Sequence, residues 1–316
     1  MSEKSIKIIP DIPPEIIDAA VNRKLAIFMG AGVSRILGCK SWNELANDLI
    51  NTCFNTKKSD GSGSRLINYK EMQTLSQMED PKKVITICER ILEFNGLKDE
   101  FYESIKKSLD ARPELIESRD VYKEIYGIPA LFISTNADTH LHKKFDENLN
   151  LSTILYKCKD FDPENLVISK IYQIHGTILD TDSLIFTVPA YIELYNNKNF
   201  RDFLNKIFTD FVVLFVGYGL GEFEVIDFLI SKNGSHSIES EKNFILLLFF
   251  QNEENILEFQ RYYHKPLGIK VIPYAIDENG YDQLFNVLKY WNEKISSETP
   301  VIIELNEVLP SPLKFL

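Results

Sequence analysis

Short apolar runs recur along the chain between segments that have the spacing of amphipathic helices. Several of these runs lack polar–apolar alternation, so we expect strands that are buried on both faces, as in a parallel sheet covered by helices. Strands are predicted at residues 25–29, 130–135, 152–155, 170–174, 211–216, 243–250 and 269–274. Helices are predicted at residues 41–54, 221–232, 253–264 and 281–294. This order predicts an α/β fold with a doubly wound, mostly parallel, Rossmann-like sheet.

One region breaks the alternation of strands and helices. Between residues 54 and 127 there is no convincing strand, and three or four amphipathic segments follow a turn-rich loop at residues 56–65. One of these segments opens with Asp80 and Pro81, which is typical of a helix N-cap followed by the first helical position. We predict one domain over residues 1–293 with a helical insertion at about 56–127. Residues 294–316 form a C-terminal tail, either an interaction segment or a linker.

Size and charge exclude several classes of protein. The chain has 316 residues, 44% of them hydrophobic and 26% charged, which is ordinary for a globular protein. Its net charge of -11 argues against nucleic-acid binding as the main activity, because neutralising phosphates needs clustered Lys and Arg. No apolar run approaches the roughly 20 residues of a membrane span, and the N-terminus lacks the apolar core of a signal peptide. A cytoplasmic protein without a membrane partner is expected.

Four cysteines are scattered along the chain, and no two of them form a CxxC pair: Cys39, Cys53, Cys88 and Cys158. A zinc ribbon needs close pairs of ligands to fold around its metal, so no metal site is predicted. We expect free thiols, buried or partly buried, in a reducing cytoplasm.

The first predicted strand runs into a glycine pair, in the sequence LAIFMGAGVSR. Gly30 and Gly32 allow a tight turn and a close approach of backbone to a ligand, and N–H groups at the following helix start attract phosphate. Arg35 stands at the third glycine position of the dinucleotide-binding pattern, and no acidic strand end follows about 20 residues on. The glycine pair therefore predicts a phosphate-binding turn that lacks the usual acidic contact to the ribose. The alternative is a strand-to-helix turn that binds no ligand.

A lysine downstream of this turn has the wrong spacing for a Walker loop. The distance from Gly32 to Gly38 is one residue too long, and a cysteine intervenes before Lys40. We expect Lys40 to be solvated. Ser41 is expected to cap the next helix, with Glu44 completing a capping box.

Polar residues also follow two other predicted strands. Thr135, Asn136 and Asp138 lie at the end of one strand, and His175 follows another. Since the carboxyl ends of parallel strands meet at one edge, where open α/β sheets bind ligands, Asn136 and His175 are expected to converge on one crevice. An imidazole with a pKa of about 6.5 accepts a proton at neutral pH. The alternatives are that Asn136 and Asp138 cap the next helix and that His175 is structural.

Two further features follow from the same reasoning. His140 and His142 are expected to be surface residues of the helix after Asp138. Gly217 and Gly219 form a second glycine-rich turn after a buried strand, which is another place for backbone to approach a nucleotide. A plain tight turn is the alternative there as well.

In this order along a doubly wound sheet, GAGxS, TNxD, HG and a late GYG turn resemble the SIR2 (sirtuin-like) NAD-binding family, in particular its bacterial antiphage-defence branch. The resemblance covers about residues 25–291. It implies that Asn136 orients the reacting ribose or water, that Asp138 contacts the nicotinamide carboxamide and that His175 is the base. It implies further NAD-binding residues on the strand-end turns: Gly30, Ala31, Gly32, Ser34, Thr135, Gly217, Tyr218 and Gly219.

The chain departs from the family's pattern in three places. Protein-deacylating sirtuins carry a zinc ribbon of two CxxC pairs, which this chain lacks. Their TQNID-type motif reads STNAD here, with Ala137 where defence relatives often have an aromatic residue. GYGLGE stands where those relatives often have GYSxxD, so that Glu222 takes the place of the Asp.

The resemblance implies chemistry at the bond between ribose and nicotinamide, which breaks through an oxocarbenium-like transition state. Water is the simplest nucleophile, because no acyl-peptide module is recognisable. NAD+ is therefore expected to be the substrate, hydrolysed to nicotinamide and ADP-ribose. A non-catalytic NAD or ADP-ribose sensing module and a zinc-free NAD-dependent protein deacylase stay as alternatives. The missing acidic ribose contact disfavours a dehydrogenase.

The same resemblance implies a biological role in antiphage defence by NAD depletion. Because unrestrained hydrolysis would kill the host, we expect the activity to be gated by a regulatory partner protein (a sensor or NTPase) or by assembly into a homo-oligomer. The helical insertion, the loop at residues 56–65 and the tail are the expected contact sites.

Overall fold

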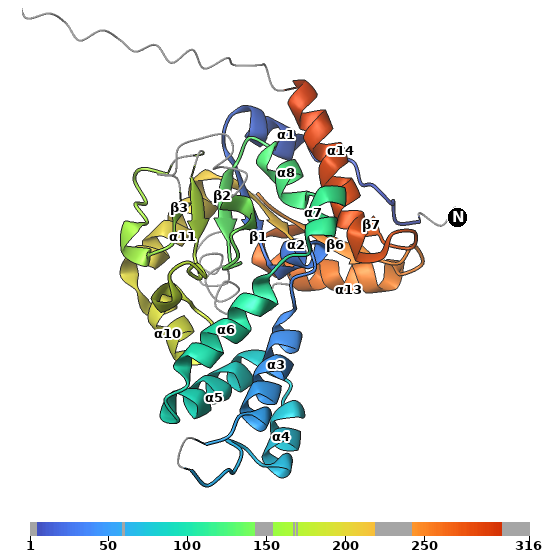
Figure 1. The fold of residues 1–316 in the computed structure, drawn as a ribbon. Helices are drawn as coiled ribbons and strands as arrows, with labels where there is room; N and C mark the ends of the chain where they lie inside the picture. The colour runs from blue at the N-terminus through green and yellow to red at the C-terminus, as the bar shows by residue number, and fades with distance from the viewer. Residues whose placement is uncertain are drawn as a thin grey trace, which may run out of the picture.

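The computed structural model describes residues 5–58, 61–142, 154–166, 168, 170–218 and 242–298. Its centre is a seven-stranded parallel sheet in the order β3-β4-β2-β1-β5-β6-β7 (Figure 1). The strands are β1 (Leu25–Met29), β2 (Leu131–Ser134), β3 (Ile154–Leu155), β4 (Ile171–Gln173), β5 (Val212–Val216), β6 (Asn243–Phe249) and β7 (Ile269–Ala275). The predicted Rossmann-like α/β fold is confirmed, and the predicted strand bounds agree with the observed ones to within two residues.

Helices cover both faces of the sheet. On β1, Leu25, Ile27 and Met29 face one apolar layer, whereas Ala26 and Phe28 face the other, and all five are fully buried. Burial on both faces explains why the predicted strands lack alternation. The first layer holds α1 (Pro14–Val21), α2 (Ala31–Ile36), α8 (Val121–Tyr126) and α14 (Gln283–Glu298). The second layer holds α10 (Val188–Asn196) and α11 (Lys198–Asp210), and α13 (Glu254–His264) packs on β7.

A group of helices, which we call the helical unit, gathers together below the sheet in Figure 1: α3 (Trp42–Asn55), α4 (Tyr69–Ser76), α5 (Pro81–Phe94) and α6 (Lys98–Leu109). These helices share a hydrophobic core of their own. Ala137 and Phe186 also belong to that core, so it is continuous with loops at the strand ends. After α7 (Pro113–Ser118), α8 packs against α2 and α14 on the sheet and not within the helical unit.

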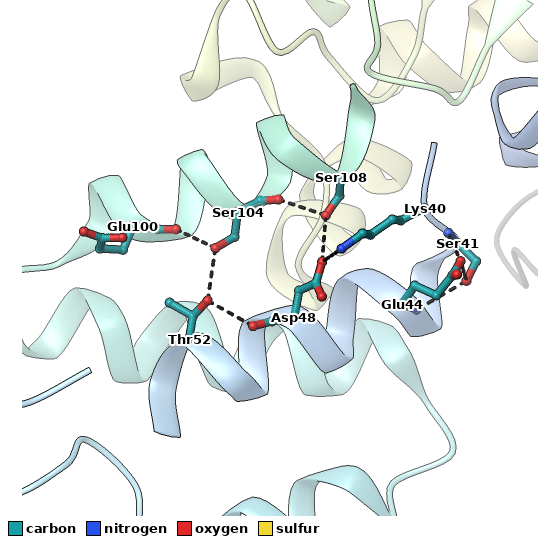
Figure 2. Close-up of polar contacts among 8 residues, drawn as sticks. All are labelled: Lys40, Ser41, Glu44, Asp48, Thr52, Glu100, Ser104 and Ser108. Carbon is teal, nitrogen blue, oxygen red and sulfur yellow. Dashed lines mark hydrogen bonds and ion pairs between the residues drawn. The ribbon is translucent and has the colours of Figure 1, made fainter. Parts of the chain in front are cut away.

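Polar contacts fix the start of α3 (Figure 2). Ser41 accepts the backbone N–H of Glu44, whose carboxylate accepts the Ser41 N–H, so the predicted capping box is present. Lys40 is exposed and pairs with Asp48, which also accepts a hydrogen bond of 3.5 Å from Ser108 on α6. The lysine that resembles a Walker residue therefore forms an exposed ion pair with α3 of the helical unit.

The C-terminal helix extends into the predicted tail. α14 ends at Glu298, so the first residues of the tail continue this helix, and residues 299–316 lie outside the described ranges. The helix predicted at residues 221–232 also lies outside them. Within the described ranges, no helix has both the length and the apolar character needed to span a membrane.

The cysteines carry free thiols, as predicted: Cys39, Cys53 and Cys88 are buried and Cys158 is half-buried. Burial raises the pKa of Cys39 to about 12, and the carboxylate of Asp138 adds to this shift. The described part of the chain contains no group of three or more His, Cys, Asp or Glu residues placed to hold a metal ion.

Candidate active site

The predicted site motifs directly follow four neighbouring strands, at the same level of the sheet. Register places four residues in one row across β5, β1, β2 and β4: Val216, Met29, Ser134 and Gln173. Two positions beyond this row, in the same strand order, come Tyr218, Ala31, Asn136 and His175. The motifs meet at the carboxyl edge, on either side of the point where the strand order reverses between β1 and β5. Open α/β sheets bind their ligands at such a point.

The two glycine-rich turns pack directly on each other. The N–H of Gly30 donates to the carbonyl of Val216 at 3.0 Å, and the N–H of Gly32 donates to that of Gly217 at 2.8 Å. A Cβ on Gly30 or Gly32 would lie 2.6 or 2.7 Å from the carbonyl oxygen of Gly217, which itself has a left-handed φ of +59°. The glycines are thus required by the contact between the turns, and two of the N–H groups are already used there.

A crevice of about 740 Å³ opens along these turns, a volume in the range of small-molecule sites. Six of the predicted NAD-binding residues line it: Gly30, Ala31, Gly32, Thr135, Gly217 and Tyr218. The predicted catalytic residues Asn136, Asp138 and His175 are not among its lining residues, although Asn136 directly follows Thr135. The start of α5 and the strand end of β6 also contribute to the lining, through Lys82 and Leu248. Gly219 lies outside the described residues, and so does Glu222.

Two cationic side chains that the sequence reasoning missed line the crevice, Arg35 and Lys82. The Arg35 guanidinium lies 5.3 Å from the ring centre of Tyr281, and Lys82 Nζ lies 3.9 Å from that of Tyr191. Lys82 follows the predicted N-cap Asp80, whose carboxylate accepts its backbone N–H. Arg35 lies within the GAGVSR turn, whereas only the packing of the helical unit on the sheet brings Lys82 here.

A buried polar network lies behind the glycine turn. Ser34 Oγ donates to Asp138 Oδ2 at 2.5 Å and is 2.8 Å from the hydroxyl of Tyr122. The same hydroxyl donates to Asp138 Oδ2 at 3.2 Å and accepts from Asn136 Nδ2 at 3.3 Å. All four residues are less than 8% exposed. The side chain of Ser34, predicted to hold phosphate, therefore takes part in this network and is not among the crevice-lining residues.

The network fixes how the Asn136 amide is oriented. One N–H of Nδ2 donates to the carbonyl of Gly30 at 2.9 Å and the other to Tyr122, so both donors are used. Among the described residues Oδ1 has no hydrogen-bond partner, which leaves it as an acceptor for a ligand. Asp138 Oδ1 accepts the backbone N–H of His140 at 3.0 Å, the capping contact that the sequence left open as an alternative.

His175 is 1% exposed and packs edge-on against two tyrosines of α10. Its Nδ1 is 3.4 Å from the hydroxyl of Tyr191, and its Nε2 is 3.4 Å from that of Tyr195. The next residue, Gly176, has a φ of +79°, and a Cβ there would meet the carbonyl oxygen of Ser183 at 2.0 Å. Backbone geometry and the tyrosine pair together set the position of the imidazole.

The prediction that His140 and His142 lie on the surface is wrong. They are 9% and 4% exposed, because the loop after β2 runs against α6 and β4. His140 Nε2 is 3.0 Å from the carbonyl oxygen of Leu109, and His142 Nε2 is 2.8 Å from Gln173 Oε1. Both rings help to hold the loop that carries Asn136.

The fold and the strand-end crevice define a Rossmann-like α/β protein with a crevice at its topological switch point, where open α/β sheets bind ligands. A family model described as a SIR2-like domain matches residues 130–272, a little under half of the chain. The match includes the TNAD loop, His175 and the Gly217 turn, and the GAGVSR turn precedes it. SIR2-like domains use NAD+, so this match supports the SIR2-like family and an NAD-related function. A search of curated proteins found no match.

Proposed function

We propose that the chain hydrolyses NAD+ to nicotinamide and ADP-ribose in this crevice. The observation that carries the proposal is the row of strand ends, which brings two glycine turns, Asn136 and His175 to one level of the sheet. The match to a SIR2-like domain makes NAD+ the nucleotide of choice. Hydrolysis is favoured over group transfer because water needs no second substrate site.

The crevice suits a dinucleotide with a pyrophosphate at its middle. The glycine turns give the backbone close access, and Arg35 and Lys82 supply two cations to a lining that also carries the carboxylates of Glu79 and Asp80. Since Gly30 and Gly32 have their N–H groups engaged by the β5 turn, side-chain cations carry more of the phosphate binding than the sequence suggests. Charge-assisted hydrogen bonds from Arg and Lys are well suited to this task.

Lys82→Ala is expected to raise KM for NAD+ about 5-fold, which corresponds to roughly 1 kcal/mol of lost binding, and to leave kcat within a factor of two. Lys83→Ala is the matched control, because the next lysine on α5 is exposed and is not among the crevice-lining residues. Steady-state rates of nicotinamide release measure both variants. Equal KM values for the two would contradict a phosphate contact by Lys82.

In the proposed reaction Asn136 and His175 act on the nucleophile. Asn136 Oδ1 accepts a hydrogen bond from the attacking water or a ribose hydroxyl, since its amide N–H groups are held by Gly30 and Tyr122. His175 accepts a proton as the new C–O bond forms at C1′ and the bond to nicotinamide breaks. Nicotinamide leaves from a cationic pyridinium, so it needs no proton. The tyrosines that flank His175 orient the imidazole for this transfer.

The hydrogen bonds of Asp138 favour a structural role over the contact with the nicotinamide carboxamide that the family resemblance implies. Its two carboxylate oxygens already accept hydrogen bonds from Ser34, Tyr122 and the His140 backbone. We propose that Asp138 chiefly holds the network behind the turn. Contact with the nicotinamide carboxamide would be made in addition to these bonds.

An assay with and without an acylated peptide distinguishes NAD+ hydrolysis from the two alternatives, a protein deacylase and a non-catalytic sensing module. Purified protein is incubated with NAD+, with and without an acetyl-lysine peptide, and nicotinamide is quantified by chromatography. A hydrolase releases nicotinamide at the same rate in both samples and leaves the peptide acetylated. Release that requires the peptide would identify a deacylase, and NAD+ that binds without release would identify a sensing module; either result contradicts the proposal.

The proposed biological role is antiphage defence by NAD depletion, gated by a partner protein or by assembly. A gate acting through the helical unit is supported by its contacts, because α5 lines the crevice and Thr86 on α5 accepts the backbone N–H of Val188 at the start of α10. α10 carries both tyrosines that flank His175. Cellular NAD is expected to fall only after phage infection of cells expressing the chain. Unchanged NAD in infected cells would contradict the role.

A further inference from the structure

Tyr122 stands on α8, outside every motif discussed for the chemistry, yet its hydroxyl contacts three of their side chains. It lies 2.8 Å from Ser34 Oγ, 3.2 Å from Asp138 Oδ2 and 3.3 Å from Asn136 Nδ2. We infer that Tyr122 is a positioning residue for the reacting centre. Its hydroxyl fixes the orientation of the Asn136 amide by linking that amide to the carboxylate of Asp138. The inference rests on the proposed NAD hydrolysis.

The direction of the hydrogen bonds follows from the number of protons. An amide nitrogen only donates, so Tyr122 must accept from Asn136, and its own proton is then left for Asp138 or Ser34. Ser34 donates to Asp138 at 2.5 Å. The result is a directed chain of donors that runs from Asn136 through Tyr122 to the Asp138 carboxylate. Without the hydroxyl, one Asn136 N–H loses its acceptor in a dry interior, where Tyr122 and Asp138 are 1% and 3% exposed.

Packing of the Tyr122 ring restricts the position of its hydroxyl. It belongs to the same hydrophobic cluster as Met29 and Val33, which flank the glycine turn. Burial and the neighbouring Asp138 raise the pKa of Tyr122, so the hydroxyl keeps its proton throughout the neutral range. A rigid ring and a retained proton make the hydroxyl a fixed point between the β1 turn and the β2 loop.

The test is Tyr122→Phe, which removes one oxygen and keeps the ring. We expect kcat for nicotinamide release to fall about 10-fold to 100-fold, because a misaligned Asn136 fails to orient the nucleophile. KM for NAD+ is expected to stay within a factor of two, since Tyr122 is not among the crevice-lining residues. Tyr126→Phe is the matched control, because it makes the same chemical change one turn further along α8 and is expected to leave both constants unchanged.

Kinetics are recorded at a temperature at which circular dichroism shows all three chains to be folded, so that lost stability does not enter the comparison. A Tyr122→Phe variant with the wild-type kcat overturns the inference and leaves the proposed hydrolysis standing. A rise in KM at unchanged kcat also overturns it, because that result assigns Tyr122 to binding. A wild-type chain that releases no nicotinamide, either alone or with an extract of phage-infected cells, overturns the proposed hydrolysis and, with it, this inference.

Discussion

Asn136→Ala and His175→Ala are each expected to lower kcat for nicotinamide release by about 10²-fold to 10³-fold. The first removes Asn136 Oδ1, which accepts no hydrogen bond from the described residues and is proposed to orient the nucleophile, and the second removes the imidazole that is proposed to accept its proton. KM should change less than kcat, because both side chains are proposed to act on the nucleophile as the bond to nicotinamide breaks. Nicotinamide is measured at saturating NAD+, at a temperature where each variant is folded.

Asn95→Ala serves as the control for the amide. Its Nδ2 donates to the carbonyl of Ile91 at the end of α5, away from the strand ends, so the same truncation should leave the rate unchanged. If Asn136→Ala and His175→Ala both keep the wild-type rate, the site assignment fails. If only His175→Ala keeps it, another group accepts the proton.

Gly32→Ala is expected to destabilise the fold by about 1–3 kcal/mol, the usual cost of forcing an extra carbon into a packed interior. The new Cβ would lie 2.7 Å from the carbonyl oxygen of Gly217 and 2.8 Å from its Cα, and these backbone atoms directly follow a strand that is paired with β1, so they cannot easily move away. For a domain of this size the midpoint of thermal unfolding falls by about 2–4 °C for each kcal/mol. The separated turns should also bind NAD+ more weakly.

Gly127→Ala is the control for this effect. Its Cβ would also meet atoms at 2.5 Å, but these belong to the side chain of Asn292, which can rotate. Thermal unfolding should therefore show a smaller loss for Gly127→Ala than for Gly32→Ala. Equal losses would mean that the contact between the two turns does not explain the glycines of the motif.

The strands were predictable because their pattern depends on local composition. β1 was predicted with its observed bounds, since five apolar residues buried on both faces leave a continuous signal. α3 and α5 were likewise marked by their caps, Ser41 and Asp80. Their packing was not predictable, because the caps do not tell which neighbours a helix meets. That packing places Lys82 at the crevice.

The site residues that directly follow strands were predictable from the sequence, whereas the contacts that other elements make with them were not. Asn136 and His175 were found because both follow strands whose ends must share one edge of the sheet. Tyr122 was missed, since it stands 88 residues from Ser34 on a helix without a motif, and only the tertiary fold joins them. The surface placement of His140 and His142 failed for the same reason: the sequence does not show that α6 and β4 cover their loop.

The glycines of GAGVSR illustrate a signal with two physical sources. The sequence suggested room for phosphate, while the structure shows that Gly30 and Gly32 also make room for the turn after β5. A glycine pattern alone does not separate these demands. The strand register and the distances between the turns separate the two demands. They show that the turns pack on each other and that both also line the crevice.

The most direct measurement follows NAD+, nicotinamide and ADP-ribose together over time in one incubation of the full chain. It is run at two protein concentrations, each with and without an extract of phage-infected cells, because assembly and a partner protein are the two proposed gates. NAD+ is expected to fall while nicotinamide and ADP-ribose rise in equal molar amounts, and His175→Ala should show neither change. NAD+ that stays constant under all of these conditions while it is bound by the chain would contradict the claim that this crevice consumes it.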